Sequence, residues 1–166
     1  MKEIGTLGEQ LVARWLHLKN YQLLASNWRC RWGEIDLIAQ DRTSGAIAFV
    51  EVKTRSAHNW DADGLLAINP SKQQKLIQTA DLFLAQQPLL AELPCRFDVG
   101  LVSYQSCDRL RRGCASRGGS ALPHRQNNLN LSPIAINQLK QLEIGQAIII
   151  DHCQLTIKDY LVAAFE

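Results

Sequence analysis

The chain has 166 residues, of which 46% are hydrophobic and 20% charged, and its formal net charge is +2. A chain of this length can bury one core without disulfides or structural metal, so a single soluble globular domain is expected. A net charge this small does not by itself call for a nucleic-acid partner, as a strongly basic chain would. No run approaches the roughly 18 apolar residues of a membrane-spanning helix.

The cysteine content indicates a reducing compartment. The five cysteines are scattered, without a C-x-x-C pair, so the sequence favours free thiols over a disulfide framework or a four-ligand zinc site. The first ten residues contain no apolar core of a signal peptide. We therefore expect a cytoplasmic protein with no membrane association.

The first element is a predicted helix. From Thr6 to Leu18, apolar residues recur at spacings of four, four and three, which is helical periodicity. Thr6 is expected to cap this helix, with Glu9 completing a capping box. Asn20 is expected to end the helix, and residues 21–27 then form a short strand.

The next elements are two strands and a helix. Residues 34–39 and 46–53 read as strands joined by a turn, which predicts a hairpin. A helix is expected to begin at Asn69, with a proline in its first position, and to end before Pro88. Residues 96–102 form the following strand. The order α-β-β-β-α-β predicts an α/β fold in which helices flank a mixed sheet.

The rest of the chain changes character. Residues 105–133 are rich in Ser, Arg, Gly and Asn and have no visible period, so we expect a basic, flexible insertion between a core domain (1–104) and a C-terminal addition (134–166). A short helix and two closing strands are expected in that addition, which completes the same domain. The arginines of the insertion suit a polyanionic substrate, or equally a solvated loop.

Charged residues lie at the end of two apolar strands. Alternation places Glu51 and Lys53 on one face of their strand and Val50 and Val52 on the other. Alone, such a pair is typical of a solvated edge strand. The neighbouring strand contains Asp36, however, and a hairpin in the right register brings it beside the pair.

Two adjacent carboxylates repel each other unless a cation or a shared proton lies between them. Mg²⁺ takes oxygen ligands and keeps waters and substrate phosphates in its other positions. A lysine beside it can orient the attacking water while the metal polarises the phosphate. The set of Asp36, Glu51 and Lys53 therefore indicates metal-assisted phosphodiester hydrolysis. Glu9 is either a fourth member or only part of the capping box.

Three motifs in this order resemble the YraN family, which is similar to the restriction-endonuclease-like PD-(D/E)xK superfamily and, in layout, to Holliday-junction resolvases. The motifs are Gly5-x-x-Gly8-Glu9, then Asn27-x-Arg29-x-x-x-Gly33-Glu34-Ile35-Asp36-Leu37-Ile38-Ala39, then Phe49-Val50-Glu51-Val52-Lys53-x-Arg55. The resemblance covers roughly residues 2–103.

The resemblance implies a restriction-endonuclease-like fold and specific site residues. Asp36 and Glu51 correspond to metal ligands, with Glu9 as an auxiliary metal-binding acid, and Lys53 to the catalytic lysine. The implied cofactor is Mg²⁺, with Mn²⁺ as a substitute. Glu34 also matches the motif. We expect it to support the metal ligands without binding the metal itself.

The resemblance also implies a nucleic-acid partner. Arg29, Arg55 and Lys75 are the candidate phosphate contacts, each alternatively a solvated surface charge. The expected function is an endonuclease acting on DNA, with branched or flapped structures as candidate substrates. The alternative is a non-catalytic nucleic-acid-binding accessory protein in DNA processing, repair or recombination. Symmetric resolvases act as dimers, so a homodimer is left open. Three tryptophans that look exposed are candidates for base stacking: Trp28, Trp32 and Trp60.

Overall fold

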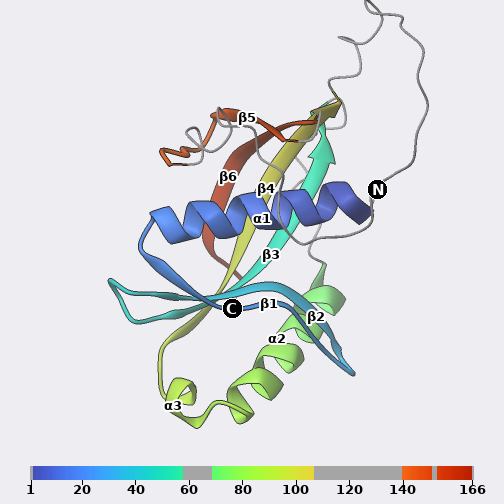
Figure 1. Cartoon of the computed structure of the whole chain (residues 1–166). Helices are drawn as coiled ribbons and strands as arrows, with labels where there is room; N and C mark the ends of the chain where they lie inside the picture. The colour runs from blue at the N-terminus through green and yellow to red at the C-terminus, as the bar shows by residue number, and fades with distance from the viewer. Residues whose placement is uncertain (1, 58–68, 107–139, 151–152, 166) are drawn as a thin grey trace, which may run out of the picture.

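A six-stranded mixed sheet, with helices on both faces, forms the framework of the computed structural model (Figure 1). The structure describes residues 2–57, 69–106, 140–150 and 153–165. The helices are α1 (Lys2–Leu18), α2 (Pro70–Ala85) and α3 (Pro88–Ala91). The strands are β1 (Tyr21–Cys30), β2 (Gly33–Asp41), β3 (Ile47–Ser56), β4 (Cys95–Ser106), β5 (Ala147–Ile150) and β6 (Cys153–Phe165).

The sheet has the strand order β1-β2-β3-β4-β6-β5. Strands β3 and β4 are parallel, because α2 crosses between them, and every other neighbouring pair is antiparallel. The predicted hairpin is confirmed as β2 and β3. This mixed α/β arrangement confirms the predicted fold class and is compatible with a restriction-endonuclease-like fold.

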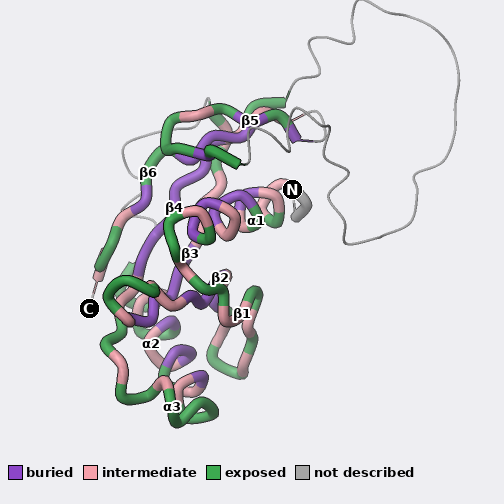
Figure 2. The backbone as a smooth tube through the Cα atoms, turned by 60° about the vertical axis from the view of Figure 1, so that its left-hand side comes forward, coloured by how far each residue is buried: buried purple, intermediate pink, exposed green. Residues whose placement is uncertain are grey.

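Strand β3 separates two hydrophobic clusters. Ala48 and Val50 lie in the cluster that includes residues of α1, whereas Ile47 and Phe49 lie in the cluster that includes residues of α2. The helices therefore cover opposite faces of the sheet, and the middle of β3 and β4 is buried from both sides (Figure 2). Beyond Val50 the same alternation continues into polar residues, which positions the site described below.

The first helix begins earlier than the sequence predicts. It starts at Lys2, so Thr6 lies inside the helix and cannot cap it, and the predicted capping box is wrong. The cost of the early glycines, about 1 kcal/mol each, is offset by packing of the helix against the sheet. Gly8 has a structural reason of its own, because a Cβ there would collide with the hydroxyl of Thr54 on β3.

The second helix begins as predicted. The Asn69 side chain accepts the backbone N–H of Lys72 at 2.9 Å, and Pro70 occupies the first turn. The helix ends at Ala85, before Pro88, which opens the short helix α3. None of the helices in the described part of the chain is long and apolar enough to span a membrane.

The closing pair of strands expected after residue 146 is confirmed as β5 and β6, and β6 is much longer than expected. Its antiparallel pairing with β4 makes it part of the same sheet. The insertion expected at 105–133 lies outside the described residues except for its first two, which end β4. Most of the helix expected at 134–142 lies outside them as well. The division into a core, an insertion and an addition therefore stays a prediction.

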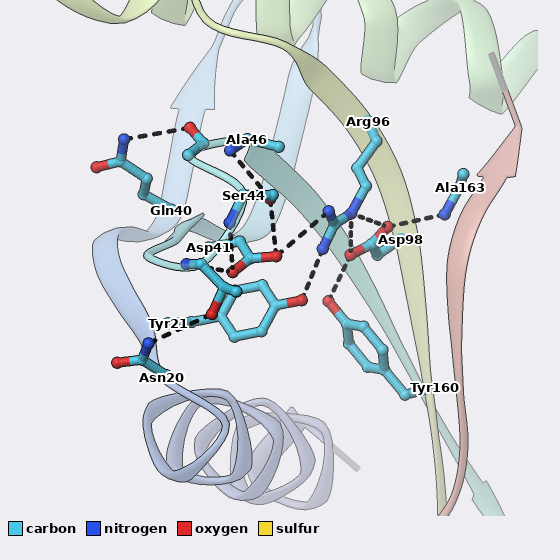
Figure 3. A network of polar contacts seen from close by, with 12 residues as sticks. Asn20, Tyr21, Gln40, Asp41, Ser44, Ala46, Arg96, Asp98, Tyr160 and Ala163 are labelled. Atoms are coloured by element: carbon cyan, nitrogen blue, oxygen red, sulfur yellow. Dashed lines mark hydrogen bonds and ion pairs between the residues drawn. The ribbon is translucent and has the colours of Figure 1, made fainter.

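A buried polar network ties β6 to the opposite part of the sheet (Figure 3). The fully buried carboxylate of Asp98 accepts the Tyr160 hydroxyl at 2.8 Å, the Ala163 N–H at 2.9 Å and the Arg96 Nε–H at 3.1 and 3.2 Å. Arg96 also donates to the Tyr21 hydroxyl of β1 at 2.6 Å. A buried carboxylate is tolerated only when it is paired in this way.

Candidate functional site

A candidate site lies where β2 separates from β3. Their paired residues run from Gln40 and Ile47 to Leu37 and Val50. Immediately beyond, Asp36 Oδ2 accepts the backbone N–H of Val52 at 2.7 Å. An aspartate side chain thus replaces a backbone partner at the point of separation, which fixes Asp36 against the following residues of β3.

The second acid is Glu51, which is 6% exposed. Its Oε1 atom is contacted by Lys53 Nζ at 2.6 Å and by Lys72 Nζ at 3.2 Å. Its Oε2 atom is buried and has no hydrogen-bond partner among the described residues. A buried carboxylate oxygen without a partner is costly, so a ligand for it is to be expected.

Asp36 lies close enough to Glu51 for the glutamate charge to affect its ionisation. Burial, and then the negative charges of Glu51 and Glu9, raise the pKa of Asp36 from its ordinary value of 3.8 to about 7. The hydrogen bond from Val52 and the charge of Lys53 act in the opposite direction. The structure therefore brings together Asp36, Glu51 and Lys53, as the sequence predicts.

Glu9 lies at the edge of this group. Its negative charge helps to raise the pKa of Asp36. Its Oε2 atom, however, accepts a hydrogen bond from the Asn27 side-chain amide at 3.0 Å. Asn27 has a φ of 51°, a left-handed conformation that asparagine adopts more readily than most residues. Over the described ranges, no three Asp, Glu, His or Cys side chains gather closely enough to form a metal-binding group. Metal binding by Glu9 stays a prediction.

The residues present are compatible with a magnesium ion. Mg²⁺ is commonly held by one or two carboxylates, with waters and substrate phosphates completing its coordination. Asp36 and Glu51 supply two carboxylates, and the unpartnered Oε2 atom of Glu51 supplies a free ligand atom. A divalent ion would also offset the burial and the carboxylate repulsion that raise the pKa of Asp36.

Lys72 is a site residue that the sequence analysis missed. It lies in the first turn of α2, and its ammonium group contacts the same Glu51 oxygen as Lys53. The signal available in the sequence was the Asn69 cap, which predicts the start of this helix but not its position over β3. Lys75, a predicted phosphate contact, is exposed one turn further along α2.

The remaining predicted residues lie on the surface. Arg29 Nε and Glu34 Oε2 form an ion pair at 2.9 Å, and both side chains are largely exposed. Glu34 therefore has a partner other than the acids of the site. Arg55 is exposed on β3, two residues beyond Lys53. Phosphate contacts by Arg29, Arg55 and Lys75 stay predictions.

Comparison with known proteins gives the chain a family. A family model described as "Uncharacterised protein family UPF0102" matches residues 8–102. The UPF0102 protein of Acaryochloris marina is 44% identical over 170 residues, covering 98% of this chain and 90% of that protein. The relative from a Synechocystis species is 41% identical over 165 residues and covers 99% of both chains.

A third relative matches a shorter region more closely. The UPF0102 protein of Thermosynechococcus vestitus is 56% identical over 105 residues, covering 63% of this chain and 84% of that protein. The family model includes all five residues of the site: Glu9, Asp36, Glu51, Lys53 and Lys72. The family named by the sequence motifs is thereby confirmed, and the chain belongs to the UPF0102, or YraN-like, family.

Proposed function

We propose that this protein is a magnesium-dependent endonuclease that hydrolyses phosphodiester bonds in DNA through a restriction-endonuclease-like site. The observation that supports this most directly is the buried carboxylate pair of Asp36 and Glu51 beside two lysines, with one Glu51 oxygen left unpartnered. Two buried acids held close together, with one carboxylate oxygen that has no hydrogen-bond partner among the described residues, are typical of a metal-binding reaction centre.

Each residue has a defined part in this proposal. Asp36 and Glu51 would hold Mg²⁺, which supplies polarisation of the phosphate and a more acidic water when bound. The Lys53 ammonium group, fixed by Glu51, orients the attacking water and offsets the negative charge that develops on the phosphate. Lys72 adds a second positive charge on the side of α2.

The charge state of Asp36 gives the site a pH dependence. Because the pKa of Asp36 is raised to about 7, this carboxyl is largely protonated in mildly acidic solution without metal. A carboxylate must be deprotonated to bind a metal, so Mg²⁺ affinity should rise with pH through this range. A purely structural charge cluster would give no such dependence.

The test is cleavage of linear, flapped and four-way DNA by highly purified protein in Mg²⁺. We expect the wild type to cleave at least one of these, and Asp36→Asn and Lys53→Ala to cleave it about 100-fold or more slowly. Arg42→Ala is the matched control, because Arg42 lies at the far turn between β2 and β3 and its exposed side chain donates to the Gln22 side chain, away from the acids of the site. Its activity should equal that of the wild type.

Calorimetric titration with Mg²⁺ and Mn²⁺ separates the alternatives. Metal binding that disappears in Asp36→Asn supports the site, whereas no binding in the wild type returns the acids to a structural role. Cleavage that persists unchanged in both active-site variants would overturn the proposal. Salt-sensitive DNA binding without cleavage would instead identify the non-catalytic accessory protein.

A further inference from the structure

The tip of the β1–β2 hairpin exposes an aromatic ring beside positive charge. Trp32 is 42% exposed, and the guanidinium carbon of Arg31 lies 4.9 Å from the centre of its ring. Arg29, at the end of β1, is also exposed. Arg29 is paired with Glu34, so the charge next to the ring is that of Arg31. An exposed aromatic face beside a guanidinium group suits a nucleobase that carries a phosphate.

The end of this hairpin next to its turn packs against α2. Trp28 packs edge-on against Phe83 at 5.5 Å, so it belongs to the core side rather than to the exposed tryptophans that the sequence suggested. The Cys30 thiol contacts the Thr79 hydroxyl at 3.7 Å and accepts the Trp32 backbone N–H at 3.3 Å. These contacts hold the backbone of the tip and leave the Trp32 ring exposed. Trp60 lies outside the described residues.

Helix α2 connects the hairpin tip to the acidic site. Lys72 contacts Glu51, and Thr79 contacts Cys30, so seven residues of helix, about 10 Å, separate the two contacts. That distance corresponds to about three stacked nucleotides of one strand. The exposed Lys75 lies three residues from Lys72 and four from Thr79, which places it along the same side of the helix.

We propose that the hairpin tip binds an unpaired nucleobase of single-stranded DNA, which stacks on Trp32 while the strand runs past Lys75 toward the acidic site. In a duplex the base faces are already covered by their neighbours, so only an unpaired base offers its face to an isolated tryptophan. That the strand runs toward the acidic site rests on the proposed nuclease function. With the hairpin tip bound in this way, the protein would prefer flapped or single-stranded substrates to paired DNA.

Binding is measured without metal, by fluorescence anisotropy of labelled single-stranded, duplex and flapped DNA in EDTA. Stacking on one aromatic side chain predicts that Trp32→Ala weakens single-strand binding about 10-fold, while Trp32→Phe weakens it less and duplex binding does not change. Leu89→Ala is the control, since Leu89 is 91% exposed on α3 and should bind as the wild type does. Arg31→Ala is compared with Arg42→Ala in the same way.

Equal single-strand binding by Trp32→Ala and the wild type would overturn the inference, as would an equal loss for single-strand and duplex DNA. Cleavage in Mg²⁺ distinguishes this failure from that of the proposed function. If the wild type cuts a flap and Trp32→Ala binds and cuts it equally well, the hairpin proposal fails and the nuclease stands. If Trp32→Ala alone loses single-strand binding while no protein cuts, the nuclease proposal fails and the hairpin stands.

Discussion

Replacing Asp36 by Asn should stabilise the metal-free protein at alkaline pH. Burial and the neighbouring Glu51 raise the pKa of Asp36 to about 7, whereas the unfolded chain has the ordinary value of 3.8. The folded protein therefore binds this proton more tightly, and its free energy of unfolding falls as pH rises from about 4 to about 7. Three pH units correspond to a ceiling of about 4 kcal/mol. Asn keeps an oxygen that can accept the Val52 N–H and removes the charge.

The assay is urea unfolding of wild type and Asp36→Asn in EDTA at pH 5 and pH 8. We expect the stability of the variant relative to the wild type to increase by about 2 to 3 kcal/mol between these two values. Asp41→Asn is the control, because hydrogen bonds from Thr43 and Ser44 lower the pKa of Asp41, which stays ionised across this range. Its difference from the wild type should be constant. An Asp36→Asn difference that is also constant would refute the reasoning.

Further substitutions test three other sets of contacts. Gly8→Ala should lower the free energy of unfolding by about 1 to 3 kcal/mol, because the added methyl group meets the Thr54 side chain. Gly5→Ala should raise it by about 0.5 to 1 kcal/mol, because its methyl group meets no other atom. Thermal unfolding measures both effects. Lys72→Met should tighten Mg²⁺ binding several-fold in calorimetry, since an ammonium group that competes for the buried glutamate is lost, and Lys75→Met should not. Tyr160→Phe should cost about 1 to 3 kcal/mol in urea unfolding, because a buried carboxylate loses a donor.

The hairpin and its acids could be predicted because regular alternation encodes them. In β3, two apolar residues on each face are followed by Glu51 and Lys53 on the face of α2, and the short turn after β2 fixes which residues pair. Charges in such a strand stand out against its apolar pattern. Asp36 was predicted beside them for the same reason, although its actual position depends on the separation of β2 from β3.

Features that depend on tertiary contacts could not be predicted. Strand β1 has a register shift between Leu23 and Ala25 and a left-handed residue at Asn27. Because these irregularities interrupt the alternation of apolar and polar residues, the sequence predicts a strand that ends at residue 27, three residues too early. Lys72 reaches Glu51 only because α2 crosses that end of β3. The early start of α1 likewise reflects packing that outweighs the low helix propensity of its glycines.

The polar network of Asp98 links strand β6 to the part of the core that the family model matches. That model ends at residue 102, within β4, and so includes Arg96 and Asp98 but neither Tyr160 nor Ala163. In this chain, β6 supplies two of the three donor groups on a fully buried carboxylate (Figure 3). Losing them would leave that charge with Arg96 alone, and a buried ion pair rarely offsets its own desolvation. Removal of β6 should therefore destabilise this chain, even though the acids of the site lie entirely within the region that the family model matches.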